Sequence, residues 1–166
     1  MIMLKSRLSR LDKLMASNRI DAIVLNPGPS LVYLTGLHFH LMERPTLFVY
    51  QQGETPILIL PELESAKLAS ISMPISVHTF GDDPNTWQQV FNQAFSKWNS
   101  KSILVGVEPN RLRFLEMEYL QKATQNAKFV SGESVISVLR SQKDADEIEC
   151  MRKAVQIAQN GLAATL

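Results

Sequence analysis

The residues best suited to chemistry lie in one short segment, where His38-Phe39-His40 is followed by Glu43-Arg44. In an extended segment the two imidazoles would share one face, as metal ligands or acid–base groups do. Glu43 is the only other candidate ligand nearby, so two loop histidines are the simpler interpretation. Arg44 either forms a surface ion pair with Glu43, which contributes little stability, or presents its guanidinium to a carboxylate.

A second concentration of reactive side chains lies near the end of the chain, at Asp144, Asp146, Glu147 and Glu149. These acids would occupy the first turns of a helix, where negative charge meets the positive end of the helix dipole. Asp144 and Glu147 also have the spacing of a capping box, so the pattern favours a helix start over a metal site. Cys150 lies beside Ile148 and Met151 and is expected to be a half-buried packing residue. A nucleophilic role would need a base, and the sequence places none nearby.

Composition and missing motifs exclude several classes of function. The sequence has no phosphate-binding GxxxxGK[ST] or GxGxxG loop, and no CxxC, HExxH or GxSxG motif. The net charge of +1, with scattered basic residues, argues against nucleic acid or an anionic membrane as a partner. Charges interrupt the first 15 residues, which indicates neither a signal peptide nor a membrane span. A single cysteine fits a reducing compartment, so we expect a cytoplasmic protein.

The elements that would position these residues alternate along the chain. Short apolar runs predict strands at 22–25, 46–50, 55–60, 75–80, 102–107 and 127–131, the second and third forming a hairpin. Apolar residues at helical spacing predict helices at 4–15, 31–36, 61–70, 84–98, 111–125, 133–140 and from 144 onward. Asn18 is expected to end the first helix, and Asp83 to cap the fourth with Pro84 in its first position. This order predicts an α/β fold in three layers, α/β/α, with a mixed sheet of about five to six strands.

The helix from 144 onward has an apolar stripe with no stop signal after it. Gly161 lies inside the pattern, and no proline or basic last turn precedes Leu166. The stripe consists of Ile148, Met151, Val155, Ala158 and Leu162. Such a stripe needs something to pack against, so we expect the chain to be the front module of a longer protein. The chemistry would then lie outside these 166 residues.

Three segments, in order, resemble the creatinase/prolidase family of Xaa-Pro aminopeptidases and dipeptidases. The first resembles the family's opening motif and consists of Ala22-Ile23-Val24-Leu25 and Tyr33-Leu34-Thr35-Gly36. The second is similar to its continuation and runs from His40 to Pro45, with Phe48-Val49-Tyr50. The third resembles the junction with the catalytic "pita-bread" domain and consists of Val138 to Lys143, Glu147-Ile148-Glu149, Met151-Arg152 and Ala154. Together they span essentially the whole chain.

The resemblance implies a protein of two domains, of which only the second is catalytic. Residues 1–140 would be the family's N-terminal domain, ribonuclease-H-like and not catalytic, and 141–166 a junction helix leading into a catalytic domain absent from this chain. That domain would hold two divalent metal ions, such as Mn, Co or Zn, on Asp, Asp, His, Glu and Glu, and would cleave Xaa-Pro peptides. None of these five ligands can be placed here, so the resemblance implies no catalytic and no metal-binding residue in this chain.

The resemblance also implies partners: the chain's own C-terminal catalytic domain, a second subunit in a homodimer and a peptide substrate. In family dimers the N-terminal domain covers the active site of the other subunit, and in creatinase-like members an arginine reaches across to the substrate carboxylate. Arg44 matches that position, with His40 as a weaker companion, whereas Met42 replaces an aromatic residue of some relatives. Two alternatives stay open: a creatinase-like amidinohydrolase that works without metal, and a peptide- or protein-binding module that has lost catalysis.

Overall fold

The computed structural model of the chain describes residues 2–98 and 102–165. Within these ranges the strands are β1 (Ala22–Leu25), β2 (Leu47–Gln51), β3 (Ile57–Pro61), β4 (Ser76–Phe80), β5 (Ile103–Val107) and β6 (Ala127–Ser131). The α-helices are α1 (Ile2–Asn18), α2 (Pro29–Thr35), α3 (Pro84–Ala94), α4 (Phe114–Ala123), α5 (Glu133–Ser141) and α6 (Ala145–Thr165), and two 3-10 segments are η1 (Glu62–Ser70) and η2 (Ser96–Trp98). The predicted alternation of helices and strands is confirmed.

The strands form one mixed sheet in the order β4-β3-β2-β1-β5-β6. β1 and β2, and β2 and β3, pair antiparallel, whereas the other neighbours pair parallel. The predicted hairpin is therefore β2–β3, and its turn contains Gly53 at φ +76°, a conformation that favours glycine. All four residues of β1 are buried, as its fully apolar sequence predicted.

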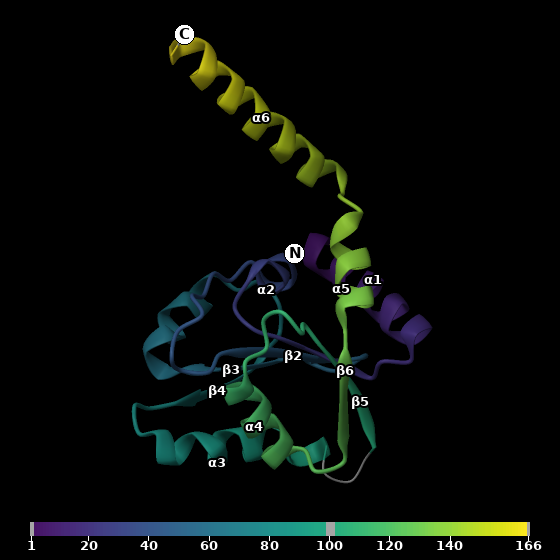
Figure 1. Cartoon of the computed structure of the whole chain (residues 1–166), viewed down its shortest axis with the longest axis vertical. Helices are drawn as coiled ribbons and strands as arrows, with labels where there is room; N and C mark the ends of the chain where they lie inside the picture. Colours follow the sequence, from purple (N-terminus) through teal and green to yellow (C-terminus); the bar gives the residue numbers. More distant parts are fainter. Residues whose placement is uncertain (1, 99–101, 166) are drawn as a thin grey trace.

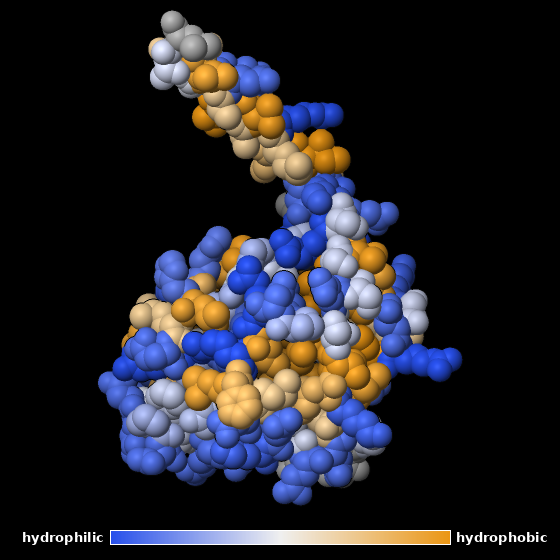
Figure 2. Space-filling view, in the orientation of Figure 1, coloured by the Kyte–Doolittle hydropathy of each residue, from blue (hydrophilic) through white to orange (hydrophobic). Residues whose placement is uncertain are grey.

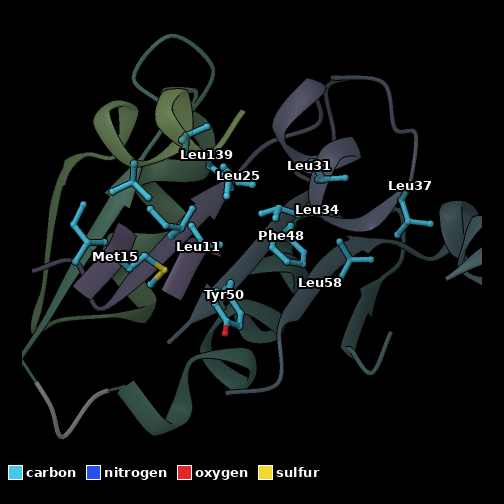
Figure 3. Packing of buried hydrophobic residues seen from close by; sticks show 14 of the residues in the cluster. Leu11, Met15, Leu25, Leu31, Leu34, Leu37, Phe48, Tyr50, Leu58 and Leu139 are labelled. Carbon is cyan, nitrogen blue, oxygen red and sulfur yellow. The ribbon is translucent and has the colours of Figure 1, made fainter. Parts of the chain in front are cut away.

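Helices cover both faces of the sheet, which confirms the α/β/α prediction (Figure 1). On one face, α1, α2 and α5 pack over the strands. Figure 3 shows Leu34 of α2 beside Phe48, and Leu11 of α1 and Leu139 of α5 near Leu25. On the other face, α3 and α4 cover a second apolar cluster. Both tryptophans, Trp87 and Trp98, are buried in that cluster, as predicted, together with Phe91 and Phe95.

Several helix boundaries differ from the prediction for local reasons. The helix expected at 84–98 ends at Ala94, and the chain continues as η2, which places Trp98 in the core. The helix expected from 111 begins at Phe114, because the N–H groups of Arg111 and Leu112 both donate to the Glu108 carbonyl in a tight turn. The helix expected at 61–70 is instead a 3-10 segment over Glu62–Ser70 without a fully buried residue, and Pro61 is the last residue of β3.

The predicted helix signals are present at α1 and α3. α1 ends at Asn18, and Arg19 follows with φ 56°. Asp83 caps α3 by accepting the Asn85 N–H, with Pro84 at the start of the helix. The side chain of Leu4, expected on the α1 stripe, lies outside the described side chains.

The α6 helix begins with the predicted capping box and then extends away from the sheet (Figure 1). The Asp144 N–H donates to Glu147 Oε2 at 2.9 Å, and the Glu147 N–H donates to Asp144 Oδ1 at 2.8 Å. Figure 2 shows apolar residues along α6, and the large ones on the predicted stripe are 40–62% exposed. Cys150 is exposed rather than half-buried, because no other described element covers this helix. No helix in the described ranges is long and apolar enough to cross a bilayer.

Two glycines bring α5 unusually close to β5. A Cβ atom added at Gly132 would lie 3.1 Å from the backbone of Gly106 and of Val107. The Gly132 N–H donates to the Val107 carbonyl at 2.7 Å, so β5 itself anchors the start of α5. The neighbours of the missing Cβ are backbone atoms of a buried strand, which cannot move aside as a flexible side chain could.

We expect the Gly132→Ala substitution to lower the free energy of unfolding by about 1–3 kcal/mol, because the methyl group would push α5 off β5. Urea unfolding followed by circular dichroism measures this change. The matched control is Gly81→Ala, since nothing lies within 4 Å of a Cβ added at Gly81, and its effect should stay within about 0.5 kcal/mol. Equal stabilities of the two variants would contradict a tight β5–α5 contact.

Candidate functional site

The predicted site residues lie in the loop 37–46, which connects α2 to β2. Gly36 ends α2 at φ +73°, a conformation that favours glycine. Leu37 and Phe39 point into the core, whereas His38 and His40 are exposed. This alternation is that of an extended segment, in which the two imidazoles lie on the same side, and here that side faces outward.

The two histidines have few companions that could complete a metal site. Among the described residues, no group of three or more His, Cys, Asp or Glu side chains is placed to hold a metal ion. Phe39, between the histidines, lies under the Lys67 ammonium, whose Nζ is 5.3 Å from the ring centroid. The packing of Leu37 and Phe39, rather than contacts of the two imidazoles, therefore holds this part of the loop in place.

Arg44 forms its ion pair with Asp82, in the turn after β4, rather than with its neighbour Glu43. Arg44 Nη2 lies 2.9 Å from Asp82 Oδ1. The Arg44 side chain is 29% exposed and that of Asp82 is 81% exposed, so water competes for both groups. Such a pair contributes little stability, and the guanidinium can exchange Asp82 for another carboxylate at small cost.

A second arginine, Arg113, holds the loop 37–46 through a hydrogen bond to its backbone. Arg113 donates through Nη1 to the Met42 carbonyl. Its Nε donates to Glu116 Oε1 at 2.9 Å, and its Nη2 donates to the same oxygen. Glu116 is fully buried, so this forked ion pair is held in a water-poor place and orients the guanidinium toward the loop.

The sequence analysis did not single out Arg113 or Glu116. Their spacing of three residues is visible in the sequence, and Glu116 lies in the first turn of α4, where the helix dipole favours an acid. The expected helix start at 111 concealed this arrangement, because it placed Arg113 inside the helix instead of immediately before it. The Met42 partner is distant in sequence, and no periodicity indicates it.

The surface around Arg44 is shallow. His40, Met42, Arg44 and Glu64 help to line a hollow of about 40 Å³, which is room for about one water molecule. A substrate could not be enclosed here by this chain alone. Any binding site that uses Arg44 needs a second surface to complete it.

A larger hollow of about 510 Å³ lies beside β4, away from the loop 37–46. Ser76 Oγ and His78 Nε2 on its wall are 3.2 Å apart, and burial lowers the pKa of His78. Among the hydrogen bonds of the described residues, no carboxylate contacts the His78 ring. The pair therefore lacks the third group that orients the base in a nucleophilic triad.

At the start of α6, Asp144 and Glu147 form ion pairs with an arginine of α1. Arg7 Nη2 in α1 lies 3.4 Å from Asp144 Oδ2 and 3.4 Å from Glu147 Oε1. The backbone N–H of Glu147 and then Arg7 hold the pKa of Asp144 below its usual value. Asp144 and Glu147 thus serve the helix start, and the interpretation as a capping box is confirmed.

The chain is similar to several known proteins. The chain is 26% identical over 158 residues to YkvY of Bacillus subtilis (strain 168), named provisionally as a dipeptidase; the match covers 95% of this chain and 43% of the relative. Among solved structures, a dipeptidase from Pyrococcus horikoshii OT3 matches with a TM-score of 0.79 and 22% identity, over 96% of this chain and 43% of that one. The N-terminal domain of an Xaa-Pro dipeptidase from Lactobacillus brevis matches with a TM-score of 0.64 and 20% identity, over 81% of this chain and 98% of that one.

The structural likenesses show a shared fold, and the chain spans less than half the length of the curated relative. The model of the creatinase/prolidase N-terminal domain matches residues 7–142, which is most of the sequence. This match includes the loop 37–46, the sheet and α5. The chain belongs to the creatinase/prolidase N-terminal domain family.

Proposed function

We propose that the chain serves as the non-catalytic N-terminal domain of a metal-dependent Xaa-Pro peptidase, an aminopeptidase or a dipeptidase. The family match over residues 7–142 carries this proposal. The relative YkvY, of which this chain spans 43%, supports it by its name and its greater length. The catalytic domain would follow α6 and hold two divalent metal ions, such as Mn, Co or Zn, which generate hydroxide and stabilise the tetrahedral intermediate.

The exposed face of α6 supports a domain beyond it. Ile148, Met151, Val155 and Leu162 are 40%, 54%, 56% and 62% exposed. Covering such a stripe removes apolar surface from water, which stabilises an interface by about 25 cal/mol per Å². We therefore assign 1–140 to the N-terminal domain and 141–166 to a junction helix that packs on the catalytic domain.

Arg44 is the residue that we assign to the substrate, as part of a homodimer in which this domain covers the partner's active site. Its guanidinium is held by a partly hydrated Asp82 and lies beside a hollow too shallow to enclose a ligand. Both features suit an arginine that meets a substrate carboxylate only when a second surface is present. His40, exposed on the same loop, is its companion. We place the protein in the cytoplasm, since its one cysteine is a free thiol.

In the full-length protein, the Arg44→Ala substitution should raise the KM for Xaa-Pro substrates about 10- to 100-fold, because a hydrogen bond between charged groups is worth about 1.5–3 kcal/mol. Steady-state kinetics measure KM and kcat, and urea unfolding should show a loss of less than about 1 kcal/mol. Asp82→Asn is the matched control: it releases the guanidinium, so KM should stay equal or fall. An unchanged KM in Arg44→Ala would remove Arg44 from substrate binding.

The isolated chain, incubated with Mn²⁺ and an Xaa-Pro dipeptide, should release no amino acid, whereas the full-length protein should hydrolyse the same substrate. Amino-acid release measured by chromatography checks both. Hydrolysis by the isolated chain would overturn the proposed non-catalytic role. A downstream sequence without the Asp, Asp, His, Glu and Glu ligands would overturn the peptidase assignment, in favour of an amidinohydrolase or a binding module.

A further inference from the structure

A polar site that the proposed function does not use lies at the carboxyl ends of β1 and β5. These strands are parallel neighbours, with Ala22 beside Val105 and Val24 beside Val107. β1 leads into α2 on one face of the sheet, whereas β5 leads into α4 on the other. Connections that leave neighbouring parallel strands toward opposite faces open a crevice, and small ligands bind at such points in α/β sheets.

Glu108, the residue after β5, carries an unsatisfied oxygen in this crevice. The residue is 7% exposed, and its Oε1 accepts a hydrogen bond from Ser30 Oγ at 2.6 Å. Its Oε2 is buried and has no hydrogen-bond partner among the described residues. A buried carboxylate with one oxygen unpaired lacks part of its hydrogen bonding, so a positive group brought to the Glu108 side chain would be favoured.

Glu108 forms part of the wall of a cavity of about 110 Å³. Since a water molecule occupies about 30 Å³ in the liquid, the cavity has room for three or four of them. A molecule of the size of glycine fits this volume. Pro109 and Ile136 contribute apolar wall, which suits a small side chain.

The wall of the cavity carries both signs of charge. Glu108 and Glu133 offer carboxylates, and Arg140 offers a guanidinium. Arg140 Nη1 is held 3.3 Å from Ser30 Oγ, so it lies beside the hydroxyl that contacts Glu108. A metal cation would be attracted by the acids but repelled by Arg140, whereas a zwitterion pairs with both kinds of group.

We infer that this cavity binds a free small α-amino acid. Its ammonium group pairs with the Glu108 carboxylate, and its carboxylate accepts from the guanidinium of Arg140. The inference rests on the cavity itself and is independent of the proposed peptidase function.

Titration calorimetry of the chain with glycine and L-alanine tests this. Both should bind in the millimolar range, and the single-charge probes methylamine and acetate should bind at least about tenfold more weakly. Glu108→Gln keeps an acceptor for Ser30 and the shape of the side chain, and should weaken glycine binding at least about tenfold. Glu62→Gln, on the exposed surface of η1, is the control and should leave binding unchanged.

If Glu108→Gln does not fold, Arg140→Gln provides the second test, because this side chain lies at the outer wall; it should also weaken glycine binding. Amide chemical shifts should change on glycine addition around 108–110 and 133–140. Absence of heat and of shift changes with glycine would overturn the inference. So would equal binding by Glu108→Gln, or a glycine-soaked crystal with only water beside the Glu108 carboxylate.

Discussion

The contact between Gly106 and Gly132 is the constraint on which the rest of the molecule depends. Since neither residue has a side chain, the start of α5 lies directly against β5. The Gly132 N–H donates to the Val107 carbonyl, so the backbone of β5 holds the start of α5 in place. With α5 in place, Arg10 of α1 can donate to the Leu139 carbonyl at 3.0 Å. The close approach therefore fixes the start of α5 against β5, and α1 packs on the helix that begins there.

Much of this fold could be predicted from the sequence, because its strongest signals are local. A fully apolar run predicts a central strand such as β1, and a three-and-four spacing predicts the buried face of α3. The boundaries that differed depend on contacts outside the pattern. α4 begins late because the Glu108 carbonyl binds two N–H groups, and Trp98 reaches the core through a 3-10 turn instead of a longer α-helix.

The candidate residues could be named from the sequence, but their contacts could not. The spacing of His38 and His40 indicated that both imidazoles share a face in an extended segment, and in the structure both are exposed. Periodicity gives the face on which a residue lies, but not which distant residue meets it. For this reason the pairing of Arg44 with Asp82, the grip of Arg113 on Met42 and the unsatisfied oxygen of Glu108 required the three-dimensional arrangement.

The ion pairs of Arg7 with Asp144 and Glu147 have a consequence for how α6 can move. α6 has 21 residues, so at about 1.5 Å per residue it extends roughly 30 Å from the point where Arg7 holds it. A rotation of about 10° at Asp144 would displace the far end by about 5 Å, since displacement grows with the length of a rigid helix. Small changes in the α1 contact are thus amplified along α6. The first helix of the chain, remote in sequence, thus contacts α6 at the point about which such a rotation would occur.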